Sequence, residues 1–500
     1  MVNNSTPDRT LAVASSPLLP ANTPSVPETY GAAVVVPLHA HDATDYLRST
    51  TAVMSTSPPR TDIDGGGPVL MLLNGETSLG SSREPSTDID VDIVQVEGAG
   101  DGDGAAADRA AVSAAEAQLP VMRSAIFTML PIFMGYASLV TLQGVVKEEI
   151  GIKDGSSALS YEFSFATSFL YLGNLIFRLM HNVVFFFLTP RHRVALAYAS
   201  MSLAIGILGV SYFLLHAKCL WPVFVAYLLG GVAIGTFESN LISCLTPLGH
   251  RTKAWAQYGI TFGFNGISIG AFLLFTAFPL QERLKAAVYL CVAVANIAGL
   301  FFYLFRVPNV RFEASRQGIR TFLGDAAAFR SWVPTIWTNC FALMIDMFAV
   351  GCFSALQIYI YDVNHIPLFF NGGHGKAAPT IPQNAFRAIY NLCSMLGDGT
   401  GRKFAYTYRR TLHPCLYLGL TVVGGACILS KQAIIAPLGQ FFVMFGNGAI
   451  YATTTRVIDD RVDRRFNLIA LSFWLFLGDV GSFSGANVVN VLRVAVGSVG

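Results

Sequence analysis

Six ionisable side chains fall inside long apolar runs of this sequence, and these are the residues most able to do chemistry there: Arg178, Glu238, Asp346, Asp398, Arg402 and Asp479. A charged group at the centre of a membrane-spanning helix costs at least about 2.5–3.5 kcal/mol on insertion scales. A residue kept at that cost is a candidate for contacting a solute, carrying a proton or pairing with another charge. Each also has a structural alternative. Arg178 can snorkel or stabilise helix packing, and Asp346 and Asp479 can hydrogen-bond to neighbouring helices.

The segment 397–403, Gly-Asp-Gly-Thr-Gly-Arg-Lys, holds the most specific pattern. Asp398 and Arg402 are four residues apart, so they share one face of a helix and can pair. Three alternate glycines weaken a helix, which predicts that another group approaches its backbone closely. Two interpretations stay open. The pair contacts a solute, or it forms a gating latch like the Asp-x-x-Gly-Arg-Lys signature at a cytoplasmic helix end of many major-facilitator carriers.

Further candidates lie on other apolar runs. Glu238 sits in the segment 230–240, whose small residues allow close helix packing and whose polar trio Glu-Ser-Asn can face a cavity. Protonated acids inside a membrane are typical proton-coupling sites, and Glu238, Asp346 and Asp479 are the candidates. Polar side chains with a solute-binding or a packing role are Gln143, Asn265 and Asn447.

These residues need membrane-crossing helices to position them, and the chain supplies about eleven apolar runs. A crossing takes roughly 20 helical residues, because only a helix satisfies its own backbone groups in lipid. The runs cover 124–146, 163–188, 194–215, 221–245, 255–278, 286–305, 333–361, 385–406, 415–429, 434–454 and 468–492. The sequence therefore predicts an all-α polytopic membrane protein, and the ninth run is the shortest.

Composition agrees with this prediction. Hydrophobic residues make up 53% of the chain and charged residues 13%, against about 25% charged residues in an average soluble domain. The mean hydropathy is +0.51. The eight cysteines lack metal-ligand spacing, and we expect them to be small buried hydrophobic residues.

The domain organisation follows from the spacing of the runs. Residues 1–119, rich in Ser, Thr, Pro, Gly and Asp, are expected to form a disordered acidic cytosolic tail. Residues 120–306 hold helices one to six, 307–332 a polar cytosolic central loop, and 333–500 helices seven to eleven. Even-numbered loops carry about twice as many Arg and Lys residues as the odd-numbered ones, which predicts a cytosolic N-terminus.

Four segments resemble the equilibrative nucleoside transporters, a family with a major-facilitator-like architecture of six plus five helices. Asp398-x-x-Gly401-Arg402 is similar to that family's Asp-x-x-Gly-Arg, and Phe445-Gly446-Asn447-Gly448 to its Ser/Thr-Asn-Gly-Tyr element. Segment 302–308 resembles the apolar run that closes in Leu-Pro before the central loop. The glycine-rich stretches 230–240 and 263–266 resemble the fourth and fifth helices.

The resemblance implies a carrier of nucleosides or nucleobases, facilitative or proton-coupled, in which Asp398 accepts from ribose hydroxyls and Arg402 holds Asp398 or contacts the sugar. Glu238 lies near a position where the family usually has Gln. The family's Trp-Asn of helix one is absent from segment 130–136, and Asn391 is out of register with the Phe-Asn that precedes the Asp of helix eight. Solute-binding candidates are therefore Asp398, Arg402, Glu238, Asn447 and Gln143.

Two alternatives stay open: a battenin-like lysosomal membrane protein, or a major-facilitator carrier of another small solute. An enzyme is not expected, because no metal-ligand cluster and no nucleophile with a nearby base is visible, and no phosphate-binding glycine loop suggests an ATP-driven pump. The expected partners are a small solute, the lipid bilayer and protons, without a cofactor, metal or nucleic acid, and the expected location is the plasma membrane.

Overall fold

The computed structural model describes residues 69–71, 93–95, 120–152, 158–278, 282–308, 323–325, 327–361, 363, 365–368, 379–408 and 413–496. The predicted acidic tail, 1–119, lies outside the described residues except for two strands, β1 (Val69–Met71) and β2 (Ile93–Gln95), which pair antiparallel. Much of the predicted central loop, 307–332, also lies outside them.

Long helices account for nearly all of the remaining described chain. The first group is α2 (Ile126–Thr141), α3 (Gln143–Ile150), α4 (Ala158–Val184), α5 (Pro190–Phe213), α6 (Trp221–Leu245), α7 (His250–Ala277) and α8 (Glu282–Arg306). The second is α10 (Phe329–Ile360), α11 (Gln383–Thr407), α12 (Pro414–Leu429), α13 (Ile435–Arg461) and α14 (Asn467–Val496). A short hairpin of β3 (His365–Pro367) and β4 (Thr380–Pro382) precedes α11.

Within the described residues, 9 helices are long and apolar enough to cross a membrane. The helix α12 is apolar but has 16 residues, and α11 has 25 residues but a more polar composition. The all-α polytopic fold is thus confirmed, while the count of eleven crossings stays a prediction.

Local sequence explains where several helices begin and end. Pro190 stands in the first turn of α5, where its missing N–H costs nothing, and the Thr189 side chain accepts from the backbone N–H of His192. Gly151 ends α3 in the left-handed conformation at φ 92°. The prediction of one continuous helix over 124–146 is wrong, because the chain breaks at Leu142. Gln143 and Gly144 follow the break, and glycine is a poor helix former.

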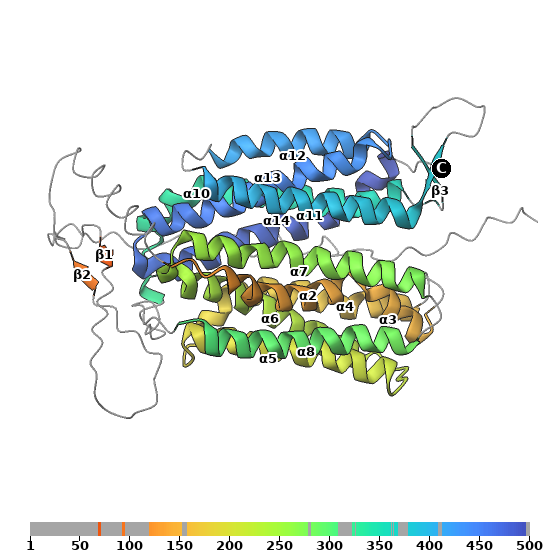
Figure 1. Ribbon diagram of the computed structural model, residues 1–500, viewed down its shortest axis with the longest axis horizontal. Coiled ribbons are helices and arrows are strands. Elements are labelled where there is room, and N and C mark those ends of the chain that lie inside the picture. Colours follow the sequence, from red (N-terminus) through yellow and green to blue (C-terminus); the bar gives the residue numbers. More distant parts are fainter. Residues whose placement is uncertain are drawn as a thin grey trace, which may run out of the picture.

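The helices form two bundles that lie one above the other in Figure 1, with α2–α8 below and α10–α14 above. Inside the first bundle α2 packs on α7 and α4 on α6. Inside the second, α10 packs on α14 and α11 on α13. The bundles meet through α7 with α11 and through α14 with α4 and α6. We call the end where α6 and α13 finish and α14 starts the basic end, and the end with α3 and the β3–β4 hairpin the distal end.

Glycines allow the closest approaches inside each bundle. A methyl group added at Gly401 of α11 would overlap the carbonyl oxygen of Phe445 on α13, and one added at Gly485 of α14 would overlap that of Phe348 on α10. Gly235 of α6 likewise lies against the backbone of α4. The backbone approach predicted for segment 397–403 is therefore present, and it comes from a neighbouring helix.

All eight cysteines are free. The expectation that they are all buried is wrong, because Cys219 and Cys291 are exposed. Cys219 precedes α6 in a connecting loop, and Cys291 lies on the outer face of α8, where a small apolar side chain suits lipid as well as a protein interior.

Candidate functional site

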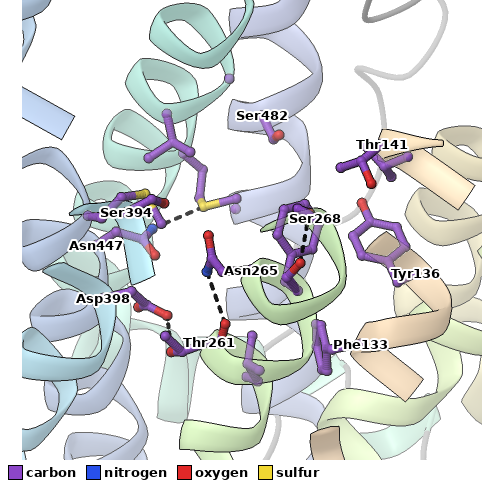
Figure 2. A pocket seen from close by; sticks show the side chains of 18 of the residues that line it. Phe133, Tyr136, Thr141, Thr261, Asn265, Ser268, Ser394, Asp398, Asn447 and Ser482 are labelled. Atoms are coloured by element: carbon purple, nitrogen blue, oxygen red, sulfur yellow. Dashed lines mark hydrogen bonds between the residues drawn. The ribbon is translucent and has the colours of Figure 1, made fainter. Parts of the chain in front are cut away.

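A cavity of about 500 Å³ lies between the two bundles. This volume is within the usual range for small-molecule sites. Its lining runs from Arg178, Arg402 and Tyr451 at the floor to Gln143, Arg387 and Asn487 toward the distal end. Figure 2 shows its two walls. Ser394, Asp398 and Asn447 form a polar wall from the second bundle, and Phe133 and Tyr136 of α2 lie opposite.

The floor is built around Arg178, which α4 places where the two bundles meet. Its Nη2 lies 2.8 Å from Glu238 Oε2 of α6, and its Nε lies 2.7 Å from Asp479 Oδ2 of α14. The Tyr451 hydroxyl of α13 donates to Glu238 Oε1. Arg178 is 4% exposed, so it does not snorkel; it joins two carboxylates from opposite bundles.

One helical turn of α11 supplies the polar centre of the cavity. Arg402 Nε donates to Asp398 Oδ1 at 2.9 Å, which confirms the predicted pair. Thr261 of α7 donates to Asp398 Oδ2 from the opposite bundle. The guanidinium of Arg402 lies 4.4 Å from the centre of the Tyr451 ring, within cation–π range. Arg402 Nη1 is buried and has no hydrogen-bond partner within the described residues.

Asp346 of α10 lies behind the polar wall, outside the cavity lining. Thr421 Oγ1 of α12 donates to its Oδ1 at 2.8 Å, and Asn447 Nδ2 of α13 donates to its Oδ2 at 2.7 Å. Because Asn447 itself lines the cavity, one side chain separates Asp346 from the cavity.

Below the floor, the basic end is closed by further contacts between the bundles. Lys253 Nζ of α7 lies 2.5 Å from Asp459 Oδ2 of α13, and both side chains are buried. His250 approaches Asp459 and Asp460, and Gln257 donates to Thr455. The described state therefore has contacts between the bundles at the basic end and a cavity that extends toward the distal end.

Eight of the nine candidates named from the sequence line this cavity: Gln143, Arg178, Glu238, Asn265, Asp398, Arg402, Asn447 and Asp479. Asp346 is the ninth and contacts Asn447. Sequence reasoning missed Thr261 and Tyr451. A signal for Thr261 existed, because Gln257, Thr261, Asn265 and Ser268 form a polar stripe at helical spacing along an apolar run. Tyr451 carries no comparable signal, since a tyrosine in a spanning helix is ordinary.

Comparison with known proteins identifies the fold of this chain through solved structures. The sequence matches no protein-family model, and no curated protein matches it. Among solved structures, the human organic anion transporter MFSD10 (TETRAN) superposes with a TM-score of 0.51 at 13% identity, over 74% of this chain and 93% of that one. A POT family transporter in complex with a thioalcohol-conjugated peptide gives 0.49 at 10% identity, over 74% and 90%.

The two bundles and the cavity between them define a polytopic helical membrane protein. The match to MFSD10 identifies its architecture as the major-facilitator fold. At 13% identity this likeness concerns the fold alone, so the resemblance to the equilibrative nucleoside transporters stays a prediction.

Proposed function

We propose that this protein is a membrane carrier that moves a small polar solute by alternating access. The central observation is a cavity between two bundles whose mutual contacts gather at one end. A carrier of this kind binds its solute between two halves that rock around it. The major-facilitator fold supports this proposal.

The polar wall favours a neutral solute with hydroxyl groups. Asp398 retains acceptor capacity beyond its bonds to Arg402 and Thr261, because a carboxylate has about four lone-pair sites. Arg402 Nη1 is a buried donor without a partner within the described chain, and such a group costs about 1–3 kcal/mol until something accepts from it. A sugar diol donates to one and accepts from the other. Of the nucleosides and nucleobases that the sequence suggests, we therefore propose nucleosides as the solute class.

An organic anion or an acidic peptide fits this site less well. The two arginines at the cavity floor, Arg178 and Arg402, are both already paired with carboxylates. An anion bound at the floor would compete with those carboxylates for the guanidinium groups. If the cells described below take up no nucleoside, the alternatives are a battenin-like protein or a carrier of another small solute.

We further propose that the basic end faces the cytosol and that the protein resides in the plasma membrane. The arginine-rich loops at the basic end support this orientation. Labelling of intact cells with a membrane-impermeant reagent at an epitope placed in the segment before α11 tests both statements, since labelling is expected only if that loop is extracellular.

The test of function is uptake of labelled adenosine, inosine, uridine and hypoxanthine by transport-deficient cells that express the chain. We expect saturable nucleoside uptake, and Asp398→Ala should abolish the uptake per molecule present at the cell surface. Hypoxanthine, which lacks the sugar, should be carried poorly if Asp398 binds the diol. Absence of uptake by surface-expressed protein would contradict the nucleoside proposal, and Glu148→Ala, in an exposed ion pair with Lys285, is the matched control.

A further inference from the structure

Asp346 differs from the other central carboxyl groups in the chemistry of its partners. Glu238, Asp398 and Asp479 each contact an arginine. Asp346 is fully buried, and its two oxygens accept from a threonine hydroxyl and an asparagine amide.

Among the described residues, Thr421 and Asn447 are the side chains that hydrogen-bond to Asp346. The helices that pack on α10 are α12, α13 and α14, and the charged group that acts on Asp346 is the carboxylate of Asp398, beyond Asn447. The arginines at this depth, Arg178 and Arg402, contact other carboxylates. An ionised carboxylate buried without a cation is costly in a membrane interior.

Thr421 and Asn447 can satisfy Asp346 in both of its protonation states. An arginine only donates, so it stabilises a carboxylate and offers nothing to a carboxylic acid. A hydroxyl and a primary amide both donate and accept. Asp346 can therefore gain or lose a proton without losing its hydrogen bonds, and no arginine contact favours its ionised form as one does for Asp398, Glu238 and Asp479.

Asn447 connects Asp346 to the cavity. Its Nδ2 donates to Asp346 and also lies 3.2 Å from Met347 Sδ, so the carbonyl oxygen is the atom that it can offer a solute (Figure 2). A proton on Asp346 Oδ2 needs an acceptor instead of a donor. Rotation of the Asn447 amide turns its carbonyl oxygen toward Asp346 and supplies that acceptor. The NH₂ group of Asn447 then points toward the cavity, so Asn447 offers the solute a donor in place of an acceptor.

We propose that Asp346 is the proton-binding site of this carrier and that Asn447 transmits its protonation state to the solute. This inference rests on the transport function proposed above. The proton comes from the solution that the cavity faces, forms one O–H bond at Asp346, and leaves as a proton when the cavity faces the other side. Solute and proton then affect each other's binding reciprocally, as linkage requires.

The first test does not depend on the solute. Infrared difference spectra of the purified protein between acidic and alkaline buffer should contain the carbonyl stretch of a buried carboxylic acid, and Asp346→Asn should remove it. Asp398→Asn should leave this band in place, because a carboxylate paired with arginine stays ionised. Thr421→Val should keep the band and shift its frequency, which tests the site in a variant that retains the carboxyl group. An unchanged spectrum in Asp346→Asn would overturn the proposal.

The second test uses proteoliposomes and labelled inosine. With an inward proton gradient the native protein should accumulate inosine, and Asp346→Asn should lower the ratio of gradient-driven accumulation to exchange of labelled for unlabelled inosine. An unchanged ratio, or accumulation driven by sodium ions alone, would overturn the proton site. If the native protein moves neither inosine nor the other three compounds, the proposed solute class is wrong, and the infrared result still decides the proton site.

Discussion

Arg178 Nε lies 2.7 Å from Asp479 Oδ2, so a single ion pair joins α4 of the first bundle to α14 of the second at the floor of the cavity. The same guanidinium holds Glu238 within the first bundle. Arg178 therefore links packing inside one bundle with contact between the two.

Replacing Arg178 by Met should strongly destabilise the protein. The change leaves Glu238 and Asp479 buried without their cation, and removing one partner of a buried ion pair costs about 3–5 kcal/mol. Thermal unfolding of the purified protein measures the loss. Lys285→Met is the control, because its pair with the exposed Glu148 is expected to contribute about 0–1 kcal/mol. Equal effects of the two substitutions would contradict the structural role of Arg178.

Two substitutions at Tyr451 distinguish the contribution of its hydroxyl to stability from the contribution of its ring. Tyr451→Phe removes the donor to Glu238 and should cost about 1–3 kcal/mol of stability. Tyr451→Leu also removes the ring beneath Arg402, and we expect a further loss of about 0.5–2 kcal/mol. Thermal unfolding of both variants tests this order. If Phe and Leu behave alike, the ring contributes nothing to holding Arg402.

Two glycines on one helix should respond in opposite ways to alanine. Gly401→Ala places a methyl group against the Phe445 carbonyl, and overpacking of this kind typically costs about 1–3 kcal/mol. Gly399→Ala meets nothing closer than Thr261 Cγ2 at 3.8 Å, so the gain in helix propensity of about 0.5–1 kcal/mol should dominate. Expression level and melting temperature of the pair provide the comparison. Similar melting temperatures would show that α11 and α13 pack less closely than described.

The Lys253–Asp459 pair should hold the basic end closed. Lys253→Met removes the cation from a buried contact between the bundles and should raise the population in which the basic end is open. A cysteine introduced at Asn487, which lines the distal part of the cavity, should then react several-fold more slowly with a membrane-impermeant thiol reagent. Labelling of the Lys285→Met protein, with the same added cysteine, provides the reference rate. An unchanged rate would mean that other contacts keep this end closed.

Helices and near-neighbour contacts could be predicted from the sequence. The run 221–245 coincides with α6, and Asp398 and Arg402 pair as their four-residue spacing indicates. Both follow from local rules, since apolar length and helical periodicity act over a few turns. The break at Leu142 could not be predicted, because a weak helix former such as Gly144 inside an apolar run does not indicate at which residue the helix is interrupted.

Contacts between distant helices could not be predicted in this way. Asp479 lies 301 residues from Arg178, and nothing in either segment indicates the other. Asp346 likewise looked equivalent to Asp479 in the sequence, and only the packing of α10 against α12 and α13 shows that one has neutral partners and the other a cation. The rotation of each helix about its axis decides such differences, and a single sequence leaves it open.

The glycines and the side chains that cross between the bundles should affect different properties: the amount of folded protein in a cell, and the rate at which each molecule works. Glycine-mediated backbone contacts lie within the bundles, while Arg178, Thr261 and Lys253 reach across with side chains alone. When the cavity closes on one side of the membrane and opens on the other, the interior of each bundle stays intact and only side-chain contacts between the bundles break. Substitutions at the glycines should reduce the number of assembled molecules. Substitutions at Thr261 and Lys253, which cross between the bundles without holding a carboxylate inside their own, should change the turnover number of those that remain.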